Sequence, residues 1–425
     1  MTKKVTVEKL IEKIEGEATL KFYYSQGVID FVDILFTSTR GIEQILQGRA
    51  AEDALVINPR VCGICGHAHL IATVQALEAC YENLALSPKA KIMRDLTRHF
   101  ELIQNHFKWF YLTLLPLHTG RQEVGKAAYI SRLMSQAIAL LAGQYPHNSY
   151  AIVGGVTCDP TPVEILQLEH LIAEAIRFFE KEIVCADTET LMGCEKVERL
   201  LSAKGDLPAM LNDLIDQKRH IMGRSFDRFI VFGEDSYFKR GKAIKTRIQP
   251  HIDERYLHIS DNSDSFAKNV AYKHKYYEVG PLSRAMLLKT PLIKDAHRRY
   301  GDSLLSRIVA RVCESIRLLH HTRAQLAKLD LSQPSWIAPE YDIRKLSGSG
   351  TAAVEAARGS LIHQVRLEEG RIASYTIVTP TQWNLSRGTP EEPGVAQKAM
   401  RGAENETFAE FIFKTFDVCS VCTTH

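Results

Sequence analysis

Two Cys-x-x-Cys pairs lie at opposite ends of this 425-residue chain. The first pair is Cys62 and Cys65, and the second is Cys419 and Cys422. Two thiolates cannot complete a tetrahedral sulfur site, so either each pair acts alone or the fold brings both ends of the chain together. If the pairs meet, the four thiolates form a site for a soft or borderline metal, and nearly the whole chain folds around it.

The cysteine pattern alone leaves three kinds of site open: structural zinc, a redox-active dithiol and a functional metal centre. Zinc is the default for four thiolates, whereas a redox dithiol does not need two distant copies. Closing a loop of about 350 residues costs roughly 5–6 kcal/mol by chain entropy, and structural zinc can release about 10–16 kcal/mol. Metal binding can therefore offset the cost of closing the loop. That cost is easier to explain for a functional metal than for a metal that only stabilises the fold.

Composition excludes several classes of function. The chain is 45% hydrophobic and 24% charged with a net charge of +3, which is typical of a globular protein and gives no reason to expect nucleic acid binding. Its nine cysteines are too few and too irregular for a disulfide framework, and none shows ferredoxin spacing, so we expect no iron–sulfur cluster in this chain. No segment reads as a transmembrane helix or a signal peptide, which predicts a cytoplasmic protein, or one exported or held at a membrane through a partner.

Hydrophobic periodicity and Pro/Gly punctuation predict a mainly α fold with small β elements (α+β), built as a bundle of long helices. We expect one domain over residues 1–425, with metal ligands from 60–69 and 417–425. A short helix is expected after Arg40-Gly41, and hairpins are expected over 17–36 and 361–378. The expected longer helices cover 67–84, 88–117, 125–141, 162–185, 301–329 and 404–415.

The residues around both cysteine pairs resemble the signatures of nickel–iron hydrogenase large subunits. Residues 60–69 (RVCGICGHAH) resemble the first metal-binding signature, and residues 416–425 (FDVCSVCTTH) resemble the C-terminal one. The resemblance spans essentially the whole chain, and the two signatures in this order are very specific. Further matching stretches occur in family order at 13–16, 39–43, 146–147, 154–156, 280–284, 355–359 and 380–384.

The resemblance implies a bimetallic centre in which four thiolates hold nickel and two of them bridge to iron. By position, Cys62 and Cys419 would be terminal on nickel, and Cys65 and Cys422 would bridge. The iron would carry one carbon monoxide and two cyanides. Electron-rich thiolates and strong-field ligands suit low-spin metals with an open position for dihydrogen.

The resemblance also assigns residues around the metals. Arg358 would lie over the open metal position, where its guanidinium stays charged at any working pH, and Ala357 would line the cyanide pocket beside it. Thr381 would donate a hydrogen bond to a cyanide, and His69 would hydrogen-bond the Cys65 thiolate from the same helical face. The alternatives are ordinary structural roles: a salt bridge for the arginine, a cap for the threonine and a buried core site for the histidine.

Two further sites follow from the resemblance. Glu15 would accept the proton that Cys419 takes from dihydrogen, because burial can raise the pKa of a glutamate towards neutrality. Glu43, the backbone carbonyl of Ile377 and His425 would bind a magnesium ion with water completing the shell. A surface carboxylate and an ordinary helix residue are the respective alternatives for the two glutamates.

The chain departs from the family pattern at several positions near these sites. Val418 and Ala357 stand where relatives usually have proline, which loosens the backbone there. Asn105 and Trp109 stand where many relatives have aspartate and histidine. The helix then lacks a carboxylate partner for the active-site arginine, and Asp417 is left as that partner.

We therefore expect the catalytic large subunit of a nickel–iron hydrogenase, an oxidoreductase that reversibly splits dihydrogen into two protons and two electrons. A chain without clusters needs an iron–sulfur small subunit as its partner, in a heterodimer or a higher oligomer of heterodimers. One alternative is a hydrogen-sensing regulatory subunit with low turnover. The related quinone-site subunit of respiratory complex I lacks the four cysteines, and a zinc-stapled interaction protein is the remaining alternative.

Overall fold

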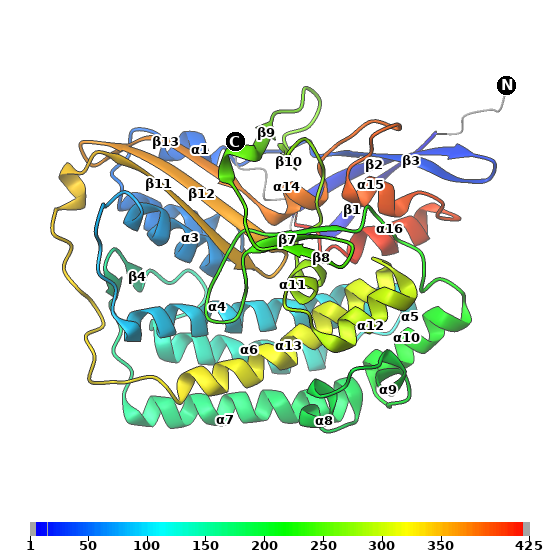
Figure 1. The fold of residues 1–425 in the computed structure, drawn as a ribbon, viewed down its shortest axis with the longest axis horizontal. Helices are drawn as coiled ribbons and strands as arrows, with labels where there is room; N and C mark the ends of the chain where they lie inside the picture. Colours follow the sequence, from blue (N-terminus) through cyan, green and yellow to red (C-terminus); the bar gives the residue numbers. More distant parts are fainter. Residues whose placement is uncertain (1–5, 15, 420–425) are drawn as a thin grey trace.

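The computed structural model describes residues 6–14 and 16–419, and it confirms a mainly α fold with small antiparallel sheets (Figure 1). The helices are α1 (Ile42–Leu46), α2 (Asp53–Ile57), α3 (Gly66–Glu78), α4 (Pro88–Lys108), α5 (Leu115–Thr119), α6 (Val124–Ala142), α7 (Pro162–Phe178), α8 (Thr188–Met192), α9 (Val197–Leu201), α10 (Asp206–Asp216), α11 (Pro281–Leu287), α12 (Pro291–Tyr300), α13 (Leu304–Leu326), α14 (Pro380–Asn384), α15 (Val395–Met400) and α16 (Glu406–Lys414). The strands are β1 (Thr6–Ile14), β2 (Gly16–Ser25), β3 (Val28–Leu35), β4 (Ala151–Ile152), β5 (Gly155–Val156), β6 (Arg228–Val231), β7 (Gly241–Ile244), β8 (Arg247–Gln249), β9 (Leu257–Ser260), β10 (Asn269–Tyr272), β11 (Gly348–Ala356), β12 (Gly359–Glu368) and β13 (Arg371–Val378).

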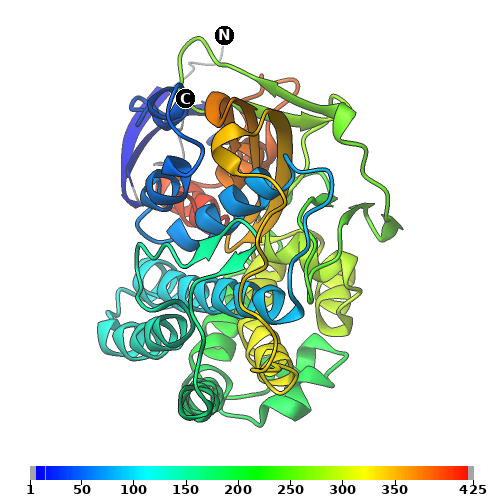
Figure 2. The same cartoon turned by 90° about the vertical axis from the view of Figure 1, so that its left-hand side faces the viewer.

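Four long helices, α4, α6, α7 and α13, form one layer of the molecule, at the bottom of Figure 1 and seen from the side in Figure 2. Helix α4 packs against both α6 and α13 and is buried along most of its length. Its start is fixed by Pro88 at the first turn and by Ser87, whose hydroxyl accepts the Ala90 N–H at 3.0 Å. Among the described residues, no helix is long and apolar enough to cross a membrane.

The predicted helix boundaries are correct to a few residues except at one end, that of the helix predicted over 67–84. The segment predicted as one helix over 88–117 contains a π-helical turn, Trp109–Leu114, and the segment over 162–185 ends in another, Phe179–Val184. The helix predicted over 67–84 ends at Glu78 because the next residues tighten into i→i+3 hydrogen bonds.

The sheet β11–β12–β13 lies above the helical layer, with α3 packed on it (Figure 1). The predicted hairpin over 361–378 is confirmed as β12 and β13, joined through Glu369 and Gly370, both with positive φ (47° and 72°). Strand β11 is a third member that the sequence analysis missed. The loop between β11 and β12 carries Arg358.

The two ends of the chain lie side by side. The predicted hairpin over 17–36 is confirmed as β2 and β3, and β1 extends it to a three-stranded sheet. This sheet, blue in Figure 1, lies beside the red helices α15 and α16. Ile29 donates its backbone N–H to the Ala403 carbonyl at 3.0 Å, and Lys9 pairs with Glu410 at 2.7 Å. These contacts tie the first strands of the chain to its last helices.

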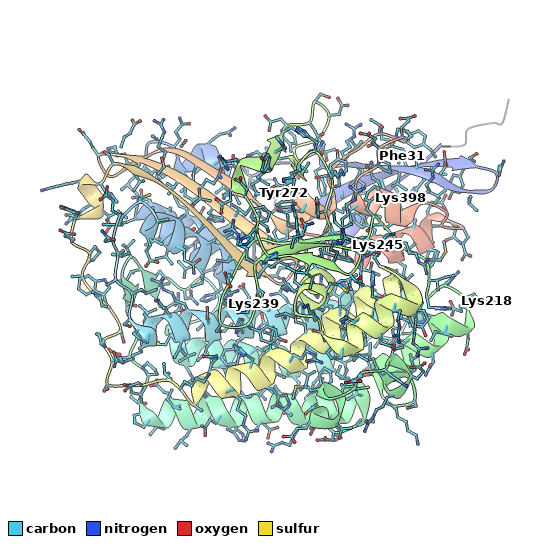
Figure 3. All side chains as sticks on the ribbon, viewed as in Figure 1. Phe31, Lys218, Lys239, Lys245, Tyr272 and Lys398 are labelled. Carbon is cyan, nitrogen blue, oxygen red and sulfur yellow. The ribbon has the colours of Figure 1, made fainter. Side chains whose placement is uncertain are left out.

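A third region consists of the small sheets β6–β7–β8 and β9–β10. Lys239, Lys245 and Tyr272, labelled in Figure 3, belong to this region, and Tyr272 is buried there. The main apolar core extends from Ile11 to Val418, and a second, smaller cluster that includes Phe232, Val270 and Trp383 lies under these small sheets.

The close contact between β11 and α3 generates a stability prediction. A Cβ on Gly350 would lie 1.9 Å from the Ala76 carbonyl oxygen, so Gly350→Ala must push the strand from the helix. We expect a loss of about 1–3 kcal/mol, as for other overpacked sites, seen as a lower midpoint of urea or thermal unfolding. Gly125→Ala is the matched control because a Cβ there meets nothing within 4 Å. Equal midpoints for the two variants would contradict the close packing.

Candidate metal centre

Three of the four signature thiols meet in a buried cluster formed from both ends of the chain. Cys62 and Cys419 have 1% and 0% exposure, and their sulfur atoms lie 3.7 Å apart. Cys65 is 6% exposed and belongs to the same cluster, with Ile64 packed against it. The fold therefore brings the first cysteine pair together with Cys419. Cys422 lies outside the described residues, as do Glu15 and His425, so the roles predicted for these three stay predictions.

The first cysteine loop is shaped by the turn before it and the helix after it. Pro59 lies in a 3₁₀ turn, and Cys65 is the N-cap residue of α3. A Cβ on Gly66 would lie 2.1 Å from the Pro59 carbonyl oxygen, so only glycine lets the loop approach this turn. The positive end of the α3 dipole lies at Cys65, where it favours a thiolate.

The segment that carries Cys419 is held by hydrogen bonds to two other elements. The Trp109 indole N–H donates to the Lys414 carbonyl at 2.7 Å, at the end of α16. The Arg358 Nε–H donates to the Asp417 carbonyl at 2.6 Å. Asp417 itself has a left-handed backbone with φ of 55°, an uncommon conformation that these contacts maintain.

Arg358 is buried beside the thiols and is paired with Asp417, as the sequence analysis expected. Its Nη2 donates to Asp417 Oδ1 at 3.1 Å, whereas its Nη1 is buried without a hydrogen-bond partner in the described part of the chain. Burial alone would lower the pKa of Arg358, but negative charge on Asp417 and on the three cysteines holds that pKa well above its usual value. The guanidinium therefore stays cationic.

Thr381 and His69 are both buried, and His69 is close enough to Cys62 for the charge of that thiol to act on it. Thr381 lies in α14, and its hydroxyl has no hydrogen-bond partner among the residues described. The His69 ring nitrogen Nδ1 lies 3.1 Å from Nε2 of His363, and burial lowers the pKa of His69 to about 4. His69 is therefore neutral, and its predicted hydrogen bond to the Cys65 thiolate stays a prediction.

Glu43 contacts the backbone of Ile377 and also a lysine that the sequence analysis missed, and the predicted magnesium site there stays a prediction. The Ile377 backbone N–H donates to Glu43 Oε1 at 2.8 Å. Lys268 Nζ donates to both Glu43 oxygens, at 2.8 and 2.7 Å. Lys268 is only 7% exposed, so its positive charge is buried against the Glu43 carboxylate.

Glu101 is a second buried charged residue that the sequence analysis missed. Its two oxygens accept the backbone N–H groups of His67 and Ala68, each at 2.9 Å, in the first turn of α3. One turn later on α4, Asn105 donates to the Ile64 carbonyl at 2.7 Å and to the Glu101 carbonyl at 2.8 Å. Both side chains thus hold the first cysteine loop against α4. In the sequence, a polar residue at helical spacing does not indicate that its side chain holds a distant loop.

Glu101 generates a prediction about stability and pH. Burial raises its pKa from 4.5 to about 8, so between these values the folded chain binds a proton that the unfolded chain has lost. The free energy of unfolding should then fall as pH rises through this window, by up to about 1.4 kcal/mol per pH unit from this group. Glu101→Gln should flatten that slope in urea unfolding, and exposed Glu169→Gln should not. Parallel slopes for wild type and Glu101→Gln would exclude the raised pKa.

Comparisons with known proteins agree with this arrangement. A family model described as nickel-dependent hydrogenase matches residues 40–117 and 210–425. The sulfhydrogenase 1 α subunit of Pyrococcus furiosus is 23% identical, over 98% of this chain and 96% of its own length. The periplasmic NiFeSe hydrogenase large subunit of Desulfomicrobium baculatum is 24% identical, over 99% of this chain and 95% of its own. The reduced Ni-Fe-Se hydrogenase of Desulfovibrio vulgaris Hildenborough superposes with a TM-score of 0.84 at 21% identity, covering 99% of this chain and 100% of that one, and so shares the fold. The chain belongs to the nickel-dependent hydrogenase large-subunit family, whose members are oxidoreductases that act on dihydrogen.

Proposed function

We propose that this chain is the catalytic large subunit of a nickel–iron hydrogenase, which reversibly splits dihydrogen into two protons and two electrons. The observation that supports this most strongly is the thiol cluster. Cys62 and Cys65 come from one end of the chain and Cys419 from the other, and all three are buried together. A structural zinc staple would not need the charged and hydrogen-bonding groups that surround them.

The residues present fit a nickel–iron centre. Cys62, Cys65, Cys419 and Cys422 would supply the thiolates that hold it. The unpartnered Nη1 of Arg358 is a donor buried beside the thiols, and Oγ1 of Thr381 is a second buried donor without a partner among the described residues. Such donors suit acceptor ligands such as cyanide on iron. When bound, the centre would supply an open position for dihydrogen and take up its two electrons.

The side chains of this protein would control the charge and the proton. Arg358 provides a fixed positive charge in a site that excludes water, where electrostatic effects are strong. The Cys419 sulfur would accept the proton of the split dihydrogen, and Glu15 would take it from that sulfur towards the surface. The Ala357 side chain is apolar, so Arg358 and Thr381 would be the side-chain hydrogen-bond donors of the proposed cyanide pocket.

Electrons must leave through another chain because the cysteines outside the two pairs have no cluster spacing. We propose an iron–sulfur small subunit as the partner, in a heterodimer or a higher oligomer of heterodimers, located in the cytoplasm. A hydrogen sensor of low turnover is the second candidate, and the departures at Asn105 and Trp109 beside the site favour it. The rate of hydrogen uptake by the purified complex separates the two.

Loss of one thiolate tests the metal site. Cys419→Ser should abolish hydrogen uptake and sharply lower the nickel content of the purified complex, because serine oxygen is a poor ligand for a soft metal. The buried Cys313→Ser is the matched control, since Cys313 lies on α13 away from the cluster, and it should keep both. The wild type should also show carbonyl and cyanide stretching bands in the infrared. Absence of nickel or of these bands in the wild type would refute the proposed function.

We further propose a magnesium ion beside Glu43, with the Ile377 carbonyl and His425 as the other protein ligands. Within a strand, the N–H and C=O of one residue point to the same side, so the Ile377 carbonyl also faces Glu43. These oxygen donors suit a hard cation. Lys268 already places positive charge on both Glu43 oxygens, so a bound ion must share the carboxylate with Lys268 or displace it.

Metal analysis of variants decides between the ion and the lysine. We expect about one magnesium per chain in the wild type, lost in Glu43→Gln and retained in Lys268→Met, as for a carboxylate-bound ion. Exposed Glu52→Gln serves as the control and should retain the ion. A fully active wild type free of magnesium would instead assign the positive charge at Glu43 to Lys268.

A further inference from the structure

Asp417 is held by two arginines rather than one. Arg358 donates to Asp417 Oδ1, and Arg311, from α13, donates to Asp417 Oδ2 at 2.9 Å. Arg311 is 2% exposed and lies more than one hundred positions away in the sequence. The proposed site therefore contains a second guanidinium, which is linked to Arg358 through the Asp417 carboxylate.

Other contacts fix the orientation of Arg311. The same Nη1 donates to the Ala357 carbonyl at 3.2 Å, directly before Arg358. The guanidinium also lies over the Trp109 ring, 5.0 Å from the ring centroid, as in other cation–π contacts. Arg311 thus contacts Ala357, which directly precedes Arg358, and Asp417, which directly precedes Val418.

A neutral histidine links Arg311 to a larger charge network. Arg311 Nη1 lies 3.3 Å from His106 Nδ1, and a guanidinium can only donate, so Nδ1 accepts and the ring proton is on Nε2. His106 Nε2 then donates to Glu314 at 2.8 Å, and burial lowers the pKa of His106 to about 4. Glu314 pairs in turn with Arg284, which also binds Glu355.

The arginines and carboxylates of the network match in number only when Arg311 is counted. Its three arginines face three buried carboxylates, Asp417, Glu314 and Glu355, with a neutral histidine between them. Burial lowers the pKa of Arg311 to about 10, which still leaves it charged near neutral pH. Without this charge, Asp417 would be shared less evenly between its partners, and its carboxylate would be free to turn towards Arg358.

We propose that Arg311 is a positioning residue for dihydrogen activation: it anchors one oxygen of Asp417, so that Asp417 holds both Arg358 and the backbone before Cys419 in place. Asp417 contacts Arg358 through its carboxylate and through its carbonyl, and it lies two residues before Cys419. A shift of Asp417 therefore moves the guanidinium and the thiol together. This inference rests on the proposed function.

The test compares Arg311→Met and Arg311→Lys with Arg94→Met in the complete complex. Arg94 is the matched control because it is also buried on a helix and binds one carboxylate, Glu78, through two hydrogen bonds at 2.9 and 2.8 Å, away from the thiols. The measurements are nickel content, the positions of the carbonyl and cyanide infrared bands, kcat and KM for dihydrogen.

For Arg311→Met we expect a loaded centre, displaced infrared bands and a kcat about 10–100-fold lower, as for other small misplacements of reacting groups. KM should change by less than about twofold because the lost effect belongs to the transition state. Arg311→Lys restores the charge and should recover part of the kcat. Arg94→Met should keep the wild-type bands and kcat even if it lowers the unfolding midpoint.

Wild-type bands and kcat in both Arg311 variants would overturn the inference and leave the proposed function intact. If Arg311→Met does not fold or load nickel, the milder Arg311→Lys decides by the same bands and kcat. A wild-type complex without nickel or infrared bands would refute the proposed function, and the inference would fall with it.

Discussion

The contact between the first cysteine loop and the segment after α16 is the constraint on which the rest of the structure depends. Cys62 and Cys419 lie 3.7 Å apart although about 350 residues separate their pairs, a loop whose closure alone costs roughly 5–6 kcal/mol. The fold distributes this cost over apolar packing and over contacts such as Ile29 with Ala403 and Trp109 with Lys414. The thiols are therefore brought together by the scaffold, and metal binding need not fold the chain.

Buried charge gives this scaffold its precision rather than its stability. A buried ion pair adds little stability compared with well-packed apolar residues, but removing one partner typically costs about 3–5 kcal/mol. The pairs of Arg284 with Glu314 and of Arg311 with Asp417 are of this kind, at 0–8% side-chain exposure. Any slip of α4, α13 or the C-terminal segment would leave a charge unpaired. The network therefore selects one arrangement of the elements around the thiols.

Helix positions were largely predictable from the sequence because the long helices combine an apolar stripe with Pro or Gly at their ends, as in α4 and α6. Strand β11 was not predictable, because its sequence, GSGTAAVEA, has few of the β-branched and aromatic residues that mark strands. The metal-site residues came from short motifs. Glu101, Lys268 and Arg311 were missed for one physical reason: a charged residue at helical or loop spacing reads as solvent-exposed until its partner, distant in sequence, is known.

The amide side chain of Asn105 on α4 determines which groups hold the proposed active site in place. Asn105 donates hydrogen bonds to the Ile64 and Glu101 carbonyls, and an ionised aspartate at this position could make neither of them. The amide therefore fixes the first cysteine loop but leaves Arg358 with Asp417 as its carboxylate partner. Asp417 adjoins the second cysteine pair, so in this chain the position of the arginine follows that of Cys419. The arginine and the thiol are therefore coupled through one residue in this chain, and Arg311 is the contact that keeps this residue fixed.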